Sequence, residues 1–152
     1  MLTLDEHGLL TPGGLLNTTL EEVEQVFVQY MPLSSNRALL FDLLVGFIKE
    51  VKSQINNEPF SFWLDGSFTA NKLNPGDIDI VLFTNHTCHS QFNHALDQLR
   101  TSRKPFIDSY FIPVYPLEHK KYSLFNLSCT EWLYVFGTSR EYKNKGILSL
   151  NA

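Results

Sequence analysis

Apolar residues recur at helical spacing in three segments of the chain. A helix is predicted over residues 20–30, because Asn17-Thr18-Thr19 offers a cap and Pro32 ends the pattern. A longer helix is predicted over residues 37–54, after the cap Ser34-Ser35-Asn36. Its buried stripe consists of Leu40, Leu43, Leu44, Phe47, Ile48 and Val51. A third helix is predicted around residues 92–99 and closes with basic residues.

Continuous apolar runs predict three strands, over residues 60–64, 77–83 and 106–115. Pro113 interrupts the last run, which favours an edge position in the sheet. A short helical turn is expected from Ser67, a polar connection over 84–90, and a less regular tail beyond Pro116. Residues 1–16 are rich in glycine and read as an irregular lead-in. The order of elements predicts one α/β (α+β) domain over residues 1–152, with a small mixed β-sheet flanked by helices.

Composition narrows the class of protein. The chain has 152 residues, of which 43% are hydrophobic, which suits one compact core. Its net charge of −4 argues against broad electrostatic binding of duplex DNA. No apolar run approaches membrane-spanning length, the N-terminus lacks a signal-peptide pattern, and the two cysteines form no CxxC pair. We therefore expect a cytoplasmic protein with reduced thiols and no membrane association.

The candidate chemistry lies between two of the predicted strands. Gly66-Ser67 ends one apolar run, and Asp77 and Asp79 stand at the head of the next. On a strand, the i, i+2 spacing puts both carboxylates on one face, where a cation such as Mg²⁺ relieves their repulsion. A Gly-Ser step presents backbone N–H groups to phosphate oxygens. The pattern predicts a phosphate cradle beside a divalent-metal site, which is typical of an enzyme that handles nucleotides.

Leu64-Asp65-Gly66-Ser67 followed by Asp77-Ile78-Asp79 resembles the polymerase-β-like nucleotidyltransferase superfamily. The stretch is similar to the minimal nucleotidyltransferases encoded beside HEPN toxins in bacteria, and closer still to a small uncharacterised bacterial family related to them. That family is also matched by the segments 63–69, 107–113, 136–140 and 145–147, together with Lys72, Pro75 and Trp132. The resemblance covers most of the chain, and its specific part is residues 63–83.

The resemblance implies a mixed sheet and a site of three carboxylates, Asp77, Asp79 and Asp108. These residues would hold Mg²⁺ or Mn²⁺ and move a nucleoside monophosphate from an NTP, ATP being expected, to an acceptor hydroxyl. Gly66 and Ser67 would grip the outer phosphates. Lys72 would neutralise charge there, in place of the arginine that relatives often carry shortly after the Gly-Ser step. The acceptor would be a protein or an RNA, in a toxin–antitoxin or phage-defence setting.

Other functions stay open at this point. The chain has no room for the extra domains that larger relatives use, so a partner protein or a homo-oligomer would supply acceptor recognition. The alternative function is a non-catalytic antitoxin or scaffold on the same fold that binds a toxin-like partner. A weaker reading is an RNA-binding module that stacks bases on aromatic residues, against which the acidic net charge counts.

Several residues also have structural interpretations. For Asp65 we expect a helix-capping role. For Arg37 we expect a place on the surface, with contact to a phosphate as the alternative, and for Lys72 a solvated loop position is the alternative to phosphate contact. His86, Cys88, His89 and His94 do not have the spacing of a zinc site. Packing in the core or against a partner is the expected use of these aromatics: Tyr110, Tyr115, Tyr122, Trp132, Tyr134 and Phe136. Residues 136–140 either close over a nucleotide or form a turn after a strand.

Overall fold

A mixed five-stranded sheet forms the centre of the molecule in the computed structural model, which describes all 152 residues. The strand order is β3 (Gly14–Asn17), β7 (Gly146–Asn151), β4 (Ser61–Asp65), β5 (Ile78–Asn85) and β6 (Ile107–Val114). Strand β4 runs antiparallel to β5 and β7, whereas β5 pairs with β6, and β3 with β7, in parallel. A small antiparallel pair, β1 (Thr3–Leu4) and β2 (Leu10–Thr11), stands apart.

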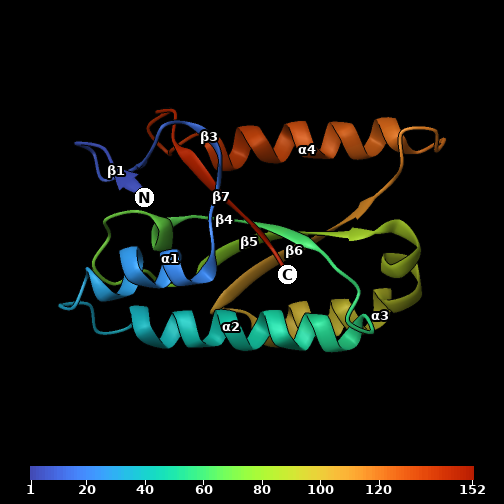
Figure 1. The fold of residues 1–152 in the computed structure, drawn as a ribbon, viewed down its shortest axis with the longest axis horizontal. Helices are drawn as coiled ribbons and strands as arrows, with labels where there is room; N and C mark the ends of the chain where they lie inside the picture. The colour runs from blue at the N-terminus through green and yellow to red at the C-terminus, as the bar shows by residue number, and fades with distance from the viewer.

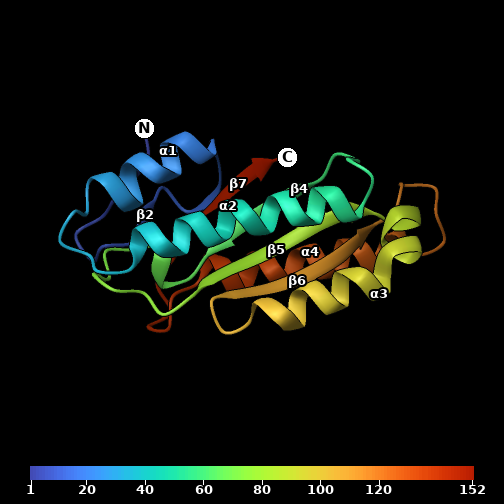
Figure 2. The ribbon, with the colours of Figure 1, turned by 90° about the horizontal axis from the view of Figure 1, so that it is seen from below.

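Helices cover both faces of this sheet (Figure 1). One face carries α1 (Leu20–Glu24), its π-helical continuation (Gln25–Gln29), α2 (Arg37–Gln54) and α3 (His86–Arg103). Helix α4 (Tyr122–Gly137) lies alone on the other face. Seen from below, α2 and α3 run side by side along β5 and β6 (Figure 2). None of the helices is both long and apolar enough to cross a membrane.

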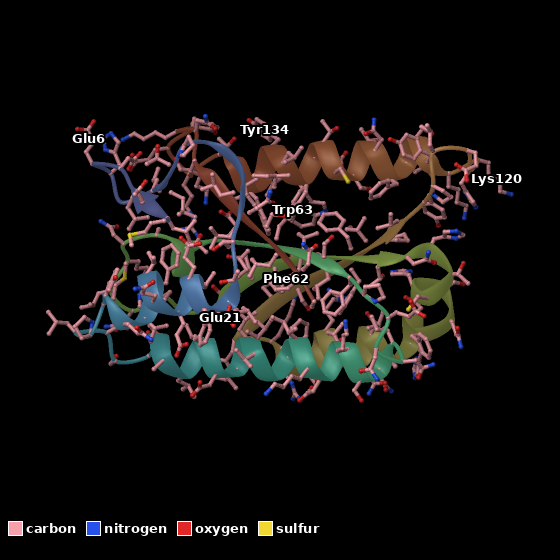
Figure 3. All side chains as sticks on the ribbon, in the orientation of Figure 1. Glu6, Glu21, Phe62, Trp63, Lys120 and Tyr134 are labelled. Atoms are coloured by element: carbon pink, nitrogen blue, oxygen red, sulfur yellow. The ribbon has the colours of Figure 1, made fainter.

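Alternation along the strands divides the core in two. Phe62 and Trp63 are neighbours on β4 and point to opposite faces (Figure 3). Phe62 belongs to the main core of 24 buried residues under α1, α2 and α3. Trp63 belongs to a second cluster of only five, with Val81, Phe83, Phe136 and Ile147. The core between the sheet and α4 therefore contains far fewer buried residues than the core on the opposite face.

The predicted fold class and several elements are confirmed. Helix α2 spans the predicted residues, a short 3₁₀ helix covers Ser67–Thr69, and β6 is an edge strand that contains Pro113. Thr19 caps α1, since its side chain accepts a hydrogen bond from the Glu22 N–H at 3.3 Å.

Three predictions about local structure are wrong. Residues 1–16 are not simply irregular, because residues 14–17 form β3, which joins the main sheet beside β7. The segment 84–90 is not a connection: β5 continues to Asn85, whose Oδ1 accepts from the Thr87 N–H at 2.8 Å and starts α3 at once. The tail beyond Pro116 is instead the continuous helix α4 and the central strand β7. Both gain their stability from packing against distant segments, which sequence spacing does not reveal.

Candidate active site

Three aspartates lie side by side at one end of the sheet, one on each of three neighbouring strands. The register places Asp65 of β4 opposite Asp79 of β5, and Asp79 beside Asp108 of β6. These positions share the face of Trp63 and Val81, which is the face that α4 covers. Asp77 precedes β5 by one residue and stands two positions before Asp79. The structure thus brings the predicted Asp77, Asp79 and Asp108 into one region, together with a fourth carboxylate.

Gly66 packs directly against Asp79. A Cβ atom at Gly66 would lie 2.0 Å from Asp79 Oδ2, so no larger residue fits without moving that carboxylate. The backbone of Gly66 has φ of +84°, in the region that favours glycine. The chain then turns into the 3₁₀ helix, where Thr69 Oγ1 donates to the Gly66 carbonyl at 3.2 Å. The Gly-Ser turn and the second aspartate of the motif are therefore in contact across the β4–β5 pair.

Asp65 is part of this site and does not cap the short helix, so the capping interpretation is wrong. Gly66 occupies the cap position, and no side chain bonds there. The Asp65 carboxylate is only 5% exposed and forms an ion pair with Lys145, whose Nζ lies 2.8 Å from Oδ1 and 3.0 Å from Oδ2. Burial raises the pKa of Asp65 to about 6, against the opposing effect of Lys145. The ion pair therefore offsets part of the cost of burying the Asp65 carboxylate.

Asp79 lies close to three other carboxylates, those of Asp65, Asp77 and Asp108. Burial is the first reason that its pKa rises to about 6, and the nearby charges of Asp77, Asp65 and Asp108 add to the rise. Lys145 acts in the opposite direction. Lys145 is the one cation that lowers the pKa of both Asp65 and Asp79, and three carboxylates oppose ionisation of Asp79, so further positive charge there would stabilise its ionised form.

Arg37 supports the Gly-Ser segment from the side of the main core. The side chain is 1% exposed, so the expectation of a surface position is wrong. Its guanidinium donates six hydrogen bonds to five backbone carbonyls, four of them in the segment 67–72. The bonds to Phe68 and Ala70 measure 2.6 and 2.7 Å. Burial lowers the Arg37 pKa to about 10, which leaves the group charged at neutral pH.

Arg37 is therefore the residue of the site that sequence reasoning missed most clearly. A fork of five N–H donors matches a loop whose carbonyls converge on one point. The available signal was an arginine at the first position of a helix with an apolar stripe, where an acidic residue is the usual choice. That signal does not name the loop that the arginine holds.

A cavity of about 710 Å³ opens between the aspartates and the end of α4. The predicted residues Gly66, Ser67, Lys72, Asp77 and Asp79 all line it, as does Asp65. From the C-terminal part of the chain come these further lining residues: Val135, Phe136, Thr138, Ser139, Arg140 and Lys145. The cavity therefore has carboxylates along the sheet, and Lys72, Arg140 and Lys145 as cations around them. Segment 136–140 borders the cavity at the end of a helix, so its interpretation as a turn after a strand is wrong.

Asp108 has a different environment from the other acids. It does not line the cavity, and its position beside Asp79 comes from the strand register. Lys104 Nζ lies 3.5 Å from its Oδ1, and the Tyr110 hydroxyl donates to Oδ2 at 3.5 Å. Oδ1 is buried and accepts no hydrogen bond. This oxygen therefore has Lys104 as an ionic partner but no hydrogen-bond donor at the edge of the site.

The fit of the site to a divalent cation rests on the kind of donors present. No three His, Cys, Asp or Glu side chains are arranged so as to hold a metal ion. The donors are nevertheless carboxylate oxygens, which Mg²⁺ and Mn²⁺ prefer, and one of them lacks a hydrogen bond. Because the charges of Asp77, Asp65 and Asp108 oppose ionisation of Asp79, a cation there would offset a repulsion that the fold already contains.

Three of the six predicted aromatic residues pack against one another, and one of the three, Phe136, also lines the cavity. Tyr110 lies 4.7 Å from Trp132 between ring centres, and Trp132 lies 5.2 Å from Phe136. These contacts confirm packing for the three residues. Tyr134 differs, since 66% of it is exposed.

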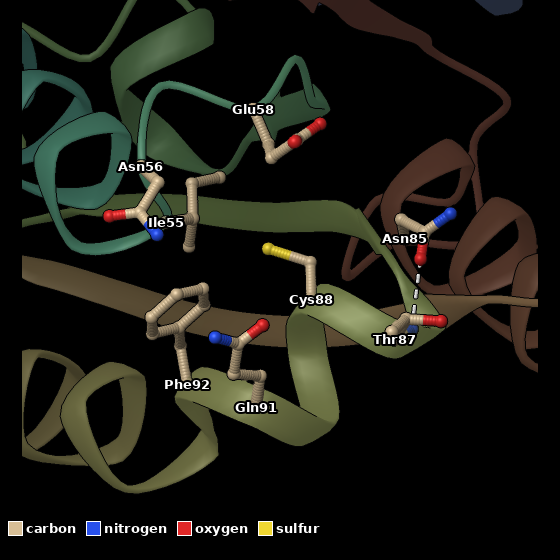
Figure 4. Close-up of a pocket in the computed structure, with 8 residues that line it drawn as sticks. All are labelled: Ile55, Asn56, Glu58, Asn85, Thr87, Cys88, Gln91 and Phe92. Carbon is tan, nitrogen blue, oxygen red and sulfur yellow. Dashed lines mark hydrogen bonds between the residues drawn. The ribbon is translucent and has the colours of Figure 1, made fainter.

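A smaller cavity, of about 250 Å³, lies at the other end of β5, where α3 begins (Figure 4). The Cys88 side chain points into it, between Ile55 and Glu58 of the opposite wall (Figure 4). Burial and the charge of Glu58 raise the pKa of the Cys88 thiol, which keeps it protonated at neutral pH. This cavity has neither the paired carboxylates nor the cations of the larger one.

Comparison with known proteins identifies the family of the chain but not its function. Residues 2–151 match a family of unknown function, DUF6932, and the chain belongs to that family. No curated protein and no solved structure matches it.

Proposed function

We propose that this protein is a metal-dependent nucleotidyltransferase that moves a nucleoside monophosphate from an NTP, ATP being the expected donor, to a hydroxyl of a protein or RNA acceptor. The acceptor oxygen would bond to the α-phosphorus as the bond to the β-phosphate breaks, and pyrophosphate would leave. One observation carries the proposal. Gly66, in a turn suited to phosphate, touches the carboxylate of Asp79 within a cavity that also presents Asp77 and cationic side chains. In a complex of metal and triphosphate, the metal is positive and the phosphates are negative. The aspartates of the cavity would bind the metal, and its lysine and arginine side chains would bind the phosphates.

The residues divide into two groups in this proposal. Asp77 and Asp79, with Asp108 as the third acid, would hold Mg²⁺ or Mn²⁺, and a cation bound there would neutralise the triphosphate and lower the pKa of the attacking hydroxyl. Gly66, with its backbone N–H, and Ser67 would bind the outer phosphates.

The remaining charged groups would neutralise the phosphates and accept the proton released in the reaction. Lys72 and Arg140 would neutralise phosphate charge from the rim of the cavity. Asp108 Oδ1 accepts no hydrogen bond, and this carboxylate would take the proton of the acceptor hydroxyl. Lys145 already neutralises Asp65, which keeps a fourth negative charge from repelling the phosphates.

The test is transfer of label from an NTP labelled at the α-phosphate, with Mg²⁺ or Mn²⁺, to candidate proteins and RNAs. The wild-type chain should transfer label, and the variant Asp77→Ala plus Asp79→Ala should not. The matched control is Asp97→Ala, which removes an exposed aspartate of α3 far from the cavity. If the double variant transfers label as well as wild type, the proposed mechanism is wrong.

A binding measurement covers the case in which the acceptor is not among those tried. Calorimetry should show that NTP binds much more tightly with Mg²⁺ or Mn²⁺ than with a chelator, and that the double variant loses this difference. If the NTP affinity is the same with and without metal, and the same in wild type and the double variant, the result favours the alternative function, a non-catalytic fold that binds a partner protein.

A further inference from the structure

Helix α4 turns an apolar surface away from the sheet. Leu124 is 59% exposed, Leu127 55%, Tyr134 66% and Val135 55%. Figure 3 shows Tyr134 on the side of α4 that faces away from Trp63 and the strands. Large apolar side chains exposed singly are ordinary, but four on one helix form a patch that marks a binding surface.

The spacing shows that these residues form one continuous stripe. Leu124, Leu127, Glu131 and Tyr134 follow each other at intervals of three, four and three residues, with Val135 beside the last. The opposite stripe packs onto the sheet with the same kind of spacing and consists of Phe125, Cys129, Trp132 and Phe136. A helix that is apolar on both sides is normally buried on both sides. We call residues 124, 127, 131, 134 and 135 the outer stripe.

The charges along α4 decide what covers the outer stripe. Glu131 is the only charged residue within α4, at the middle of the stripe. Lys120 and Lys121 precede the helix and Arg140 follows it, all three exposed. Glu118 and Glu141 are exposed beside these cations, and Lys143 pairs with Glu141, so each end keeps an excess of one positive charge. The order of net charge along the surface is therefore positive, negative, positive.

A second copy of this chain is a poor match for that order. Two antiparallel α4 helices would bring the lysines of each copy to the Arg140 end of the other. Two parallel helices would put Glu131 against Glu131 and lysines against lysines. Like charges at a contact cost stability in either arrangement. The complementary surface is apolar, with a cation at its centre and acidic residues at its ends.

We infer that the outer stripe of α4 binds an amphipathic helix of another protein, whose apolar face carries a central Lys or Arg and acidic flanks. Helices recognised in this way insert apolar side chains at intervals of three and four residues, which is the spacing of the stripe. The stripe also leads to the larger cavity, because Val135 belongs to both. A partner helix docked on α4 would end at the rim of that cavity. The inference concerns binding alone and stands whether or not nucleotide is transferred.

The probe is a labelled synthetic peptide of about 18 residues, slightly longer than α4, with leucines at heptad positions, one central lysine and glutamates at its ends. A counter-peptide has glutamate in place of the central lysine. Fluorescence anisotropy with the full chain, without nucleotide or metal, measures both affinities. The lysine peptide should bind roughly fivefold more tightly, the upper range for one exposed ion pair. Glu131→Lys should reverse this preference.

Two further variants separate the stripe from any other apolar surface. Leu127→Ser should weaken binding of the lysine peptide about tenfold, since it removes a side chain from the centre of the contact. Leu39→Ser changes a leucine of α2 that is similarly exposed, at 57%, and should leave binding unchanged. All three positions are at the surface, and circular dichroism checks that the variants remain folded.

Three results would overturn the inference. One is that neither peptide binds, and the second is that Glu131→Lys leaves the preference between the peptides unaltered. The third comes from sedimentation: a wild-type dimer that Leu127→Ser converts to a monomer would make the second copy the occupant of the stripe.

Discussion

Replacing Arg37 by methionine tests whether this one side chain holds the Gly-Ser segment in place. The substitution keeps an unbranched side chain with good helix propensity at the start of α2 but removes all the donors of the guanidinium. Five carbonyls would then lose this donor, and Ser67, Phe68, Ala70 and Lys72 supply four of them. The Ser67 carbonyl would keep its bond from the Ala70 N–H.

The six hydrogen bonds of Arg37 give an upper limit for the loss of stability, and we expect the actual loss to be smaller. At about 1.5–3 kcal/mol for a hydrogen bond to a charged group, six bonds would sum to roughly 9–18 kcal/mol. That sum exceeds the whole stability of about 5–15 kcal/mol of an ordinary domain, so the bonds are not additive. The burial that lowers the pKa of Arg37 shows that desolvation offsets part of the gain. A buried acceptor left without its donor costs about 1–3 kcal/mol, and because the loop can relax we expect a total loss of about 4 kcal/mol.

Equilibrium unfolding in urea, followed by circular dichroism, measures this loss. With a slope of about 2 kcal/mol per molar urea, a loss of about 4 kcal/mol lowers the midpoint by about 2 M. Hydrogen exchange should show the amides of residues 67–72 losing protection before those of α3. The control is Arg100→Met, which removes an exposed ion pair to Asp97 and should change stability by less than about 0.5 kcal/mol. A midpoint shift for Arg37→Met below about 0.5 M would refute the reasoning.

Two other predictions concern the aspartates. Gly66→Ala should lower the unfolding midpoint and abolish metal-dependent NTP binding, because the new methyl group would clash with Asp79 and the φ angle of this residue is positive. The control is Gly46→Ala in α2, where the added methyl group meets no other atom. This substitution should stabilise the protein by up to about 1 kcal/mol. The second prediction concerns pH: Asp79 and Asp65 have folded pKa values raised to about 6 from 3.8, so their contribution to stability is present at low pH and should be lost as pH rises from about 4 to 6. Asp5, Glu21 and Glu22 have lowered pKa values and contribute in the opposite direction, so the comparison is made with a variant. Asp79→Asn should gain stability relative to wild type as pH rises, by about 1–2 kcal/mol at pH 7 in the absence of metal. Urea midpoints of both proteins across this pH range check the statement, and a difference between them that does not change with pH would contradict it.

Local patterns were reliable where one segment determines its own structure. The stripe of α2 and the run of β5 could be read from spacing and composition, since each needs only a single apolar face or core. Helix α4 was not predicted in this way, because it has apolar residues on both sides and its sequence therefore shows no clear period of 3.6 residues. Strand β7 was not predicted either, because its place between β3 and β4 depends on partners more than 80 residues away.

The candidate site shows the same division. Gly66, Ser67, Asp77 and Asp79 were found from sequence because their chemistry depends on short spacings. Asp65 and Arg37 were misread, as a cap and as a surface residue, because their partners are distant: Lys145 lies 80 positions from Asp65, and the loop that Arg37 holds begins 30 positions beyond it.

Two features could be inferred without the structure: the mixed α/β fold class, and the grouping of a Gly-Ser turn with two aspartates. The folded chain was needed to show that Asp65, Asp79 and Asp108 lie in one row, that Lys145 forms an ion pair with the first of them, and that α4 borders the cavity while its other side stays exposed. Strand register and ion pairing join segments with no local relation, so they depend on how the whole core packs.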